Sequence, residues 1–466
     1  MRGAGAIGLL LAAFACAGPS SDAPRDTPDD AAQDRAPLDV AFEDVPADSP
    51  SPANEAPEID PLFLLDDGAM KTPVVQVMTG SPGRFANPAF FAYQDGDGPW
   101  RPLVPEATGV YRFHVDHPSG RYGVAVASTG EDAGLPAHAK VVEVRLFFAT
   151  TDEALSVPAT GPGDWPPPGK QRFAVKGSVK GWEATDPPVA HVACSAAVDE
   201  VPKSSPGYSL AVASGLQDVA ASLGDRGWIR RDLGVTKDWT LAIDLAVDGF
   251  DLARHQATLA APDPNDKVTW RADLLTARRT LLPGTPAEGA TAPFFVLPPD
   301  RRVAGDLYRL SALARLDGTR SREASAWLAT PSDRALKLPP IHLTGSVEAG
   351  ATGPVATWGN YPDAKLYRLA YETRAGTWEW VRWDVAATPS RLGAERRLVP
   401  PDLGQAEGWS DAFAPLAGVG PTWELRAYQC SGSVEDLLAA LEWGPLSKTE
   451  GVPDGLTVGA AVLSSP

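Results

Sequence analysis

From Tyr111 onward the chain reads YRFHVDHPSGRYGVAVA, and this stretch predicts the fold class. Its first five residues alternate apolar with polar side chains, which places Tyr111, Phe113 and Val115 on one face. A period of two is typical of a strand with one buried and one solvated face. The segment 116–120 has turn composition, and 122–127 is expected to run back as the hairpin partner of the first strand.

The same periodicity surrounds this hairpin. One short strand is expected at Val75 and Val77, another begins at Phe90, and the segment 141–148 closes the unit. No apolar stripe of helical period competes with these strands. Residues 61–157 are therefore expected to form an N-terminal β module.

Composition supports an all-β class and narrows the partners. The 466 residues include 44 Gly and 46 Pro, which favour many short strands and turns over long helices. Lys and Arg number 41 against 59 Asp and Glu, so the net charge is −18. This excess of acid argues against nucleic acid or an anionic membrane face as the main partner.

The first 16 residues predict a signal peptide. Arg2 precedes an apolar run from Ala4 to Ala15, which is too short for a permanent transmembrane helix. The run ends in LAAFAC, and this segment resembles a bacterial lipoprotein signal. The resemblance implies that the Cys16 thiol is diacylated and that Cys16 becomes the mature N-terminus. The alternative is ordinary secretory cleavage, with Cys16 incidental.

The resemblance also implies a location. A lipid-modified Cys16 would make the membrane a partner through an N-terminal lipid anchor. Residue 17 is Ala rather than Asp, which by the sorting rule of enteric bacteria implies an outer-membrane lipoprotein. The protein is then expected in a bacterial cell envelope, facing the periplasm or the cell surface.

Residues 17–60 are expected to be a disordered, Pro-rich acidic tether. The segment holds twelve acidic and two basic residues and eight prolines, so it carries a net charge of −10. Such a composition cannot bury enough apolar surface to offset its ordering entropy. Calcium binding is the alternative for this acidic run, although it lacks loop glycines. A second linker, rich in Pro and Gly, is expected at 158–170.

Residues 171–252 resemble the carboxypeptidase-regulatory-like β-sandwich family. The resemblance rests on the strand segments 173–179, 206–215, 217–221 and 230–235, which include a G-x-V opening strand and a glycine turn. It implies a seven-stranded accessory fold without catalytic activity, because the peptidase chemistry of the family's name belongs to a separate domain.

The segments 253–342 and 343–466 look like two copies of one unit. Each has a strand, a Pro-Pro-Asp turn and an aromatic-x-Leu strand in that order. Each also begins with a strand that carries a tryptophan, Trp270 in the first copy and Trp358 in the second. The pair resembles tandem fibronectin type III-like sandwiches, with an insertion at 404–421 in the second copy. The expected fold is therefore all-β, with tandem antiparallel β-sandwich modules after the tether.

Two acidic or histidine-bearing segments are candidate metal sites. Asp95 and Asp97 flank a glycine and could bind calcium through carboxylate oxygens, but the segment also reads as an Asp-Gly hairpin turn. His114 and His117 form an H-x-x-H pair around Asp116 without a third ligand nearby in sequence, which favours a solvated turn. We therefore expect no cofactor.

The segment WEWVRW holds Trp378, Trp380 and Trp383. In a strand, Trp378 and Trp380 share one face while Val381 and Trp383 share the other. Exposed tryptophans along a sheet could bind sugar rings or a partner's apolar patch. The alternative is a strand covered by the core on one side and by a module contact on the other.

These patterns predict an exported lipoprotein that acts as a non-enzymatic structural or interaction protein of the bacterial cell envelope. Its possible partners are another envelope protein or a polysaccharide, which the three tryptophans would bind. The chain has no H-E-x-x-H, G-x-S-x-G, C-x-x-C or P-loop motif. A hydrolase with residues that converge only in space is the less favoured alternative. Cys194 is expected to be a small core residue.

Limited proteolysis of the mature protein is expected to cut first between Ser20 and Asp60, because this segment combines high charge, frequent Pro and no apolar periodicity. The cleavage sites can be read by mass spectrometry of the first fragments. First cuts within the β modules, with the tether intact, would contradict this prediction.

Overall fold

The computed structural model describes residues 72–78, 88–107, 110–131, 140–158, 171–195, 197–340, 343–350, 352–376, 378–394, 396–416, 421–441 and 452–465. The predicted signal peptide, Cys16, the acidic tether 17–60 and most of the linker 158–170 lie outside these residues. In the described part of the chain, strands far outnumber helices, so the predicted all-β class is confirmed. No helix there is long and apolar enough to cross a membrane.

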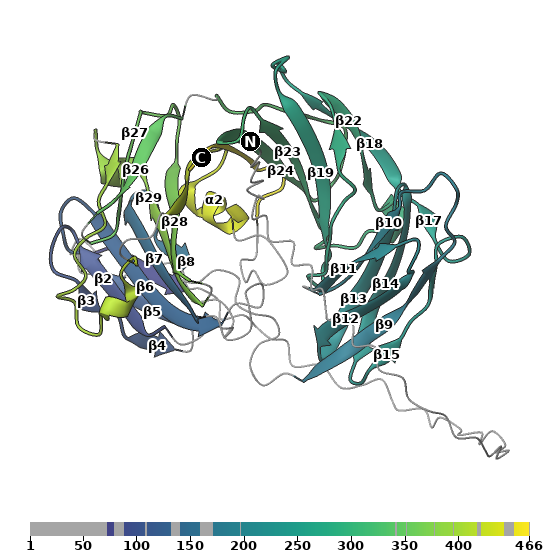
Figure 1. Ribbon diagram of the computed structural model, residues 1–466, viewed down its shortest axis with the longest axis horizontal. Coiled ribbons are helices and arrows are strands. Elements are labelled where there is room, and N and C mark those ends of the chain that lie inside the picture. Colours follow the sequence, from purple (N-terminus) through teal and green to yellow (C-terminus); the bar gives the residue numbers. More distant parts are fainter. Residues whose placement is uncertain are drawn as a thin grey trace, which may run out of the picture. The chain divides into compact units, whose positions relative to one another are not determined.

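The described strands include one sheet of thirteen that collects segments from three of the four predicted modules (Figure 1). Its order is β20 (Leu281–Leu282), β19 (Lys267–Leu275), β23 (Leu307–Arg315), β24 (Arg320–Leu328), β32 (Thr457–Ser464), β31 (Thr422–Cys430), β28 (Leu366–Ala375), β29 (Glu379–Ala387), β7 (Lys140–Thr150), β6 (Arg121–Glu131), β2 (Phe90–Asp95) and β3 (Arg101–Pro102), with β21 (Ala287–Glu288) also paired to β19.

Smaller sheets accompany it in the described residues. Near the start of the chain, the order is β4 (Pro105–Ala107), β5 (Val110–His114), β1 (Val74–Met78) and β8 (Ser156–Pro158). Two three-stranded sheets follow later, one with β22 (Thr291–Val296), β18 (Ala253–Leu259) and β25 (Arg334–Leu336), the other with β26 (Gly345–Ala349), β27 (Pro354–Trp358) and β30 (Arg397–Leu398).

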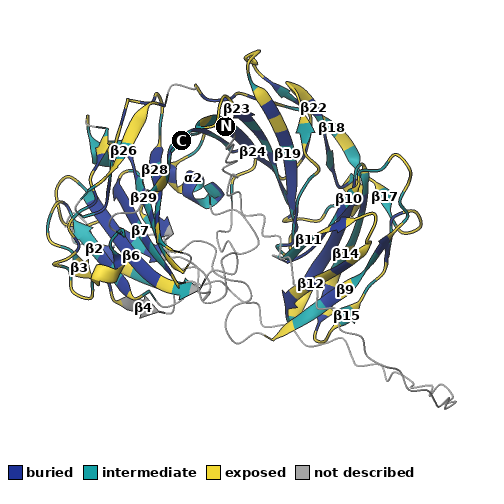
Figure 2. Ribbon diagram, in the orientation of Figure 1, coloured by how far each residue is buried: buried dark blue, intermediate teal, exposed yellow. Residues whose placement is uncertain are grey.

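The segment 171–252 forms a two-sheet sandwich. One sheet has β11 (Ala197–Pro202), β10 (Val189–Cys194), β13 (Gly215–Leu223), β14 (Arg226–Val235) and β17 (Phe250–Asp251), and the other has β12 (Gly207–Ala213), β9 (Arg172–Lys180), β15 (Trp239–Thr240) and β16 (Ile243–Asp244). Val175, Leu210, Val192 and Val219 pack in the core between them, with Cys194 fully buried as expected. Buried positions recur along β12 and β10 (Figure 2).

The N-terminal segment and the C-terminal segment share two apolar cores. β7 pairs in parallel with β29 over nine residues, from Lys140 opposite Glu379 to Phe148 opposite Ala387. Because alternate residues of a strand point to opposite faces, Phe147 joins one core while Phe148 joins the other. Both cores contain residues from 72–158 and from 343–465, so these two segments pack as one unit.

The predicted hairpin between 111–115 and 122–127 is wrong. β5 pairs with β1 and β4, whereas β6 pairs with β2 and β7. The inward face was predicted correctly, because Phe113 and Val115 are buried. The turn at 116–120 therefore carries the chain from one sheet to another, and the Phe113 ring meets the Tyr122 ring edge-on at 5.8 Å across that step.

The two tryptophan strands of the predicted repeat do not occupy equivalent places. β19, with Trp270, pairs directly with β23. β27, with Trp358, pairs with β26 and β30 in a separate sheet, and it is β28 that pairs with β31. The later halves of the repeat do correspond, since β24 and β32 follow β23 and β31 and pair with each other. This pairing joins the two copies in the thirteen-stranded sheet.

Short helices punctuate the strands: α1 (Pro389–Leu392), α2 (Val434–Leu441) and the 3-10 turns η1 (Pro299–Arg301) and η2 (Asp411–Phe413). The helix α2 was not predicted from the sequence. A capping box marks its start: the Ser433 hydroxyl accepts a hydrogen bond from the Asp436 N–H, and the Asp436 carboxylate accepts one from the Ser433 N–H. The apolar face of α2, which includes Leu437, packs into the core beside β8.

Replacing Trp383 by Ala is expected to lower the free energy of unfolding by about 3–5 kcal/mol, because a large buried side chain is lost from a close-packed core. The Trp378→Ala variant is the matched control, and its effect is expected to stay within about 0.5 kcal/mol because Trp378 is a surface side chain. Calorimetric unfolding of both variants measures the difference. Equal stability of the two variants would contradict the assignment of Trp383 to the core.

Candidate functional site

The WEWVRW segment, in which exposed tryptophans were predicted, lies at the start of β29. Trp378, which immediately precedes β29, is 53% exposed, and Trp380, two residues further on, is half-buried. The guanidinium groups of Arg374 and Arg382 lie 5.5 and 5.7 Å from the Trp380 ring centroid. This group of two tryptophans and two arginines is called the aromatic surface below.

Trp383 does not belong to the aromatic surface. It is 1% exposed, and its indole N–H donates to the Phe413 carbonyl at 3.0 Å. The prediction that Trp383 binds a ligand is therefore wrong, because the opposite face of β29 packs into the core. Trp409 meets the Trp383 ring edge-on at 6.2 Å within that core. The predicted division of the segment into two faces is correct.

Asp95 and Asp97 form an intramolecular turn. β2 and β3 pair on either side of it, and Gly96 has a positive φ of 61°. The Asp95 carboxylate accepts the backbone N–H groups of Asp116 and His117. The Asp97 carboxylate lies 2.9 Å from the Arg391 guanidinium. These contacts use the carboxylate oxygens that a calcium site would need, and they favour the hairpin-turn interpretation.

The histidine pair takes part in local hydrogen bonds. The Nδ1 atom of His117 lies 2.7 Å from the Ser119 hydroxyl, and that of His114 lies 3.2 Å from the Thr72 hydroxyl. Across the described ranges, no group of three or more His, Cys, Asp or Glu side chains is placed to hold a metal ion. Among the described residues, the fold therefore places no third metal-ligating side chain beside Asp95 and Asp97.

The two cysteines that the structure describes are free thiols. Burial raises the pKa of the Cys194 thiol to about 12, and burial also raises the pKa of Cys430. A raised pKa keeps a thiol protonated at neutral pH, and the thiolate is the reactive form. Burial therefore disfavours the thiolate form of both cysteines.

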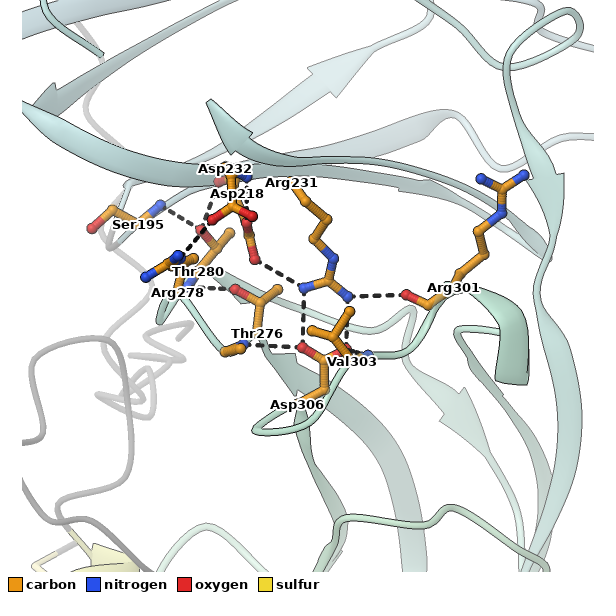
Figure 3. A network of polar contacts seen from close by, with 11 residues as sticks. Ser195, Asp218, Arg231, Asp232, Thr276, Arg278, Thr280, Arg301, Val303 and Asp306 are labelled. Atoms are coloured by element: carbon orange, nitrogen blue, oxygen red, sulfur yellow. Dashed lines mark hydrogen bonds and ion pairs between the residues drawn. The ribbon is translucent and has the colours of Figure 1, made fainter. Parts of the chain in front are cut away.

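A buried polar cluster joins the segments 171–252 and 253–340 (Figure 3). Arg231 lies at its centre and donates to Asp218 at 2.9 Å and to Asp306 at 2.6 Å. Both carboxylates are almost completely buried. Burial alone would lower the pKa of Arg231, but hydrogen bonds and charge from Asp306 and Asp218 outweigh burial and raise it.

Two threonines extend this cluster. The Thr280 hydroxyl accepts the Ser195 N–H at 2.9 Å and donates to the Asp218 carbonyl at 2.7 Å. The Thr276 hydroxyl accepts the Thr280 N–H at 3.1 Å. This cluster was not predicted from the sequence. Its members are separated by up to 111 positions of chain, from Ser195 to Asp306, so no local motif contains them.

A small cavity of about 40 Å³ lies between the same two segments. It is lined by Ser222 and Leu252 from the first segment and by residues that include Trp270 and Tyr308 from the second. The Ser222 hydroxyl has no hydrogen-bond partner in the structure. The volume has room for a few water molecules and is far too small for a substrate.

Comparisons with known proteins assign no family. No family model matches the chain, and no curated protein matches it. The resemblances to carboxypeptidase-regulatory-like and fibronectin type III-like modules therefore stay predictions.

Several solved structures of other proteins align with parts of the chain. The Bacillus anthracis TIE protein is 9% identical, with 57% of this chain and 50% of that chain covered and a TM-score of 0.14. The chain thus spans about half the length of that protein. A tetra-tandem repeat from the extending region of a large adhesion protein is 11% identical, covering 77% and 95%, with a TM-score of 0.11. A streptococcal ancillary pilin is 8% identical, covering 63% and 96%, with a TM-score of 0.13. Such TM-scores do not establish a shared arrangement.

Proposed function

We propose that this protein is a non-enzymatic structural or interaction protein of a bacterial cell envelope, anchored by lipid on Cys16. The observation that carries the proposal is the LAAFAC segment, followed at once by a 44-residue stretch of high acidic and Pro content. An anchor followed by a self-repelling spacer would hold the β modules away from the bilayer. The outer membrane is the proposed site.

The described β modules are consistent with this role. Their candidate reactive groups make intramolecular contacts: Asp95 with backbone N–H groups, Asp97 with Arg391, and Arg231 with two buried carboxylates. Such contacts stabilise loops and module boundaries. They support a scaffold that presents a surface, and the partner is proposed to be another envelope protein.

Binding of a polysaccharide is a second candidate function, and one observation favours it. Trp378 is the only tryptophan among the large apolar side chains that the described residues leave exposed, and the half-buried Trp380 lies two residues further along the chain. Aromatic rings on a sheet surface stack well against sugar rings because the apolar C–H face of a sugar packs against the flat aromatic ring. Trp383 is excluded from this site by its burial.

Lipid anchoring is tested by detergent phase partitioning of the protein expressed in a host that processes lipoproteins. The wild type is expected in the detergent phase and the Cys16→Ser variant in the aqueous phase, because two or more acyl chains hold a protein stably on a bilayer. Both proteins in the aqueous phase would show that Cys16 follows an ordinary secretory cut, and the anchored role would then be rejected.

Polysaccharide binding is tested by native gels cast with a uronic-acid polymer such as alginate or with a neutral β-glucan. Retardation in one of these gels is expected, and Trp378→Ala or Trp380→Ala should abolish it because each removes a stacking surface. Trp239→Ala is the matched control, since Trp239 is also partly exposed and lies 5.5 Å from the Arg230 guanidinium. Migration unchanged in both polymers, or equal loss in the control, would count against this function.

A further inference from the structure

We propose that the segments 171–252 and 253–340 form one rigid body, locked by the buried cluster around Arg231. Under this proposal their covalent boundary at Leu252–Ala253 does not act as a hinge. The inference goes beyond the envelope role proposed above and does not depend on it, because it concerns only the mechanics of the folded chain. Inter-domain interfaces within a chain usually permit relative motion unless specific contacts prevent it.

The Arg231 guanidinium forms the first contact of this lock. Its Nη1 atom donates to Asp218 of its own segment at 2.9 Å and to Asp306 of the next segment at 3.0 Å. Its Nη2 atom donates to the second Asp306 oxygen at 2.6 Å and to the Arg301 carbonyl at 3.1 Å. A two-oxygen contact with a guanidinium fixes orientation as well as distance.

Asp306 is held in place by its own segment. One of its oxygens accepts the Ala277 N–H at 3.0 Å, and the other accepts the Val303 N–H at 3.1 Å. The carboxylate therefore cannot follow Arg231 if the segments move apart without breaking these bonds as well. Figure 3 shows Asp306 and Arg231 facing each other, with dashed contacts to Val303 and Arg301.

Thr280 forms the second contact, on the other side of Asp218. It lies in the loop between β19 and β20 and is fully buried. Its hydroxyl bonds both the Ser195 N–H and the Asp218 carbonyl, and the Leu281 N–H donates to the Ser195 carbonyl at 3.2 Å. One loop of the second segment is thus bonded to the backbone of the first at two places, after the end of β10 and at the register shift within β13.

Residues of the buried cluster around Arg231 also have unusual backbone conformations. Ser195, Asp232 and Arg279 have φ values of 55°, 53° and 64°, in the left-handed region that non-glycine residues rarely adopt. The Asp232 N–H donates to Asp218, and the Arg279 N–H donates to the Thr276 carbonyl. Such a conformation is strained and persists only where surrounding contacts determine it. The contacts of the lock provide that determination.

Apolar packing continues the interface beyond the polar cluster. Ala193 and Ala220 from the first segment belong to the same buried core as Trp270 and Leu282 of the second, and Ile229 packs against this core. These core side chains from both segments are removed from solvent. Loss of one partner of a buried ion pair in such a place leaves an uncompensated charge, so a variant at the lock should loosen the interface.

The test measures the distance distribution between spin labels by double electron–electron resonance in the full chain. Labels are placed by Val247→Cys and Leu316→Cys, which are exposed positions on the two segments. Cys16 and Cys430 are replaced by Ser, and Cys194 is retained because it is buried. A single narrow distribution is expected for the locked protein. A broad or multi-peaked distribution would overturn the proposal.

Three variants assign the rigidity to the lock. Arg231→Met and Thr280→Val are expected to broaden the distribution, and Thr280→Val removes both hydroxyl contacts with almost no change in side-chain shape. Arg278→Met is the matched control, because it deletes an ion pair with Asp232 that is about half exposed on both partners. A distribution that stays narrow in both Arg231→Met and Thr280→Val, or broadens as much in Arg278→Met, would overturn the assignment.

Discussion

The parallel pairing of β7 with β29 is the constraint on which most of the described structure depends. It brings a strand at 140–150 beside one at 379–387, more than two hundred residues later. Parallel strands cannot be joined by a tight turn, so such a pair requires a long connection. Here the connection holds the whole of 171–340, which forms smaller sheets of its own and also adds β19, β20, β21, β23 and β24 to the same thirteen-stranded sheet. The N-terminal strands thereby complete the cores of the C-terminal segment, and neither set buries its apolar face alone.

Charged pairs on one face of the same sheet help to set its register. Asp384 of β29 lies opposite Arg145 of β7 and forms an ion pair with Arg368 of β28. Burial would raise the pKa of Asp384, but these two arginines outweigh burial and lower it. A slip of one residue would turn Asp384 into the apolar core and Trp383 out of it. Such a slip would also break the pairing of Asp384 with Arg368 and Arg145.

Sequence periodicity predicted the strands and their faces but not their neighbours. The alternation at 111–115 identified Phe113 as buried, and the alternation at 378–383 separated Trp380 from Trp383 correctly. Both patterns are local, because a period of two reports which face is covered and says nothing about which strand lies alongside. The hairpin at 111–127 failed for this reason. A turn of ordinary composition can join strands of one sheet or pass between two sheets, and here it passes between them.

The same distinction explains which parts of the candidate sites were predictable. Asp95 and Trp378 stand in short segments with a visible signal, an Asp-Gly turn and a run of tryptophans. No such pattern surrounds Arg231, because its role depends on ion pairs with Asp218 in a neighbouring strand and with Asp306, which lies 75 residues further on. An acidic chain with 59 carboxylates offers many partners to each arginine, and sequence alone cannot select among them. Selection comes from the fold: only a carboxylate that is itself held by backbone N–H groups, as Asp306 is, keeps a fixed geometry for a guanidinium from another segment.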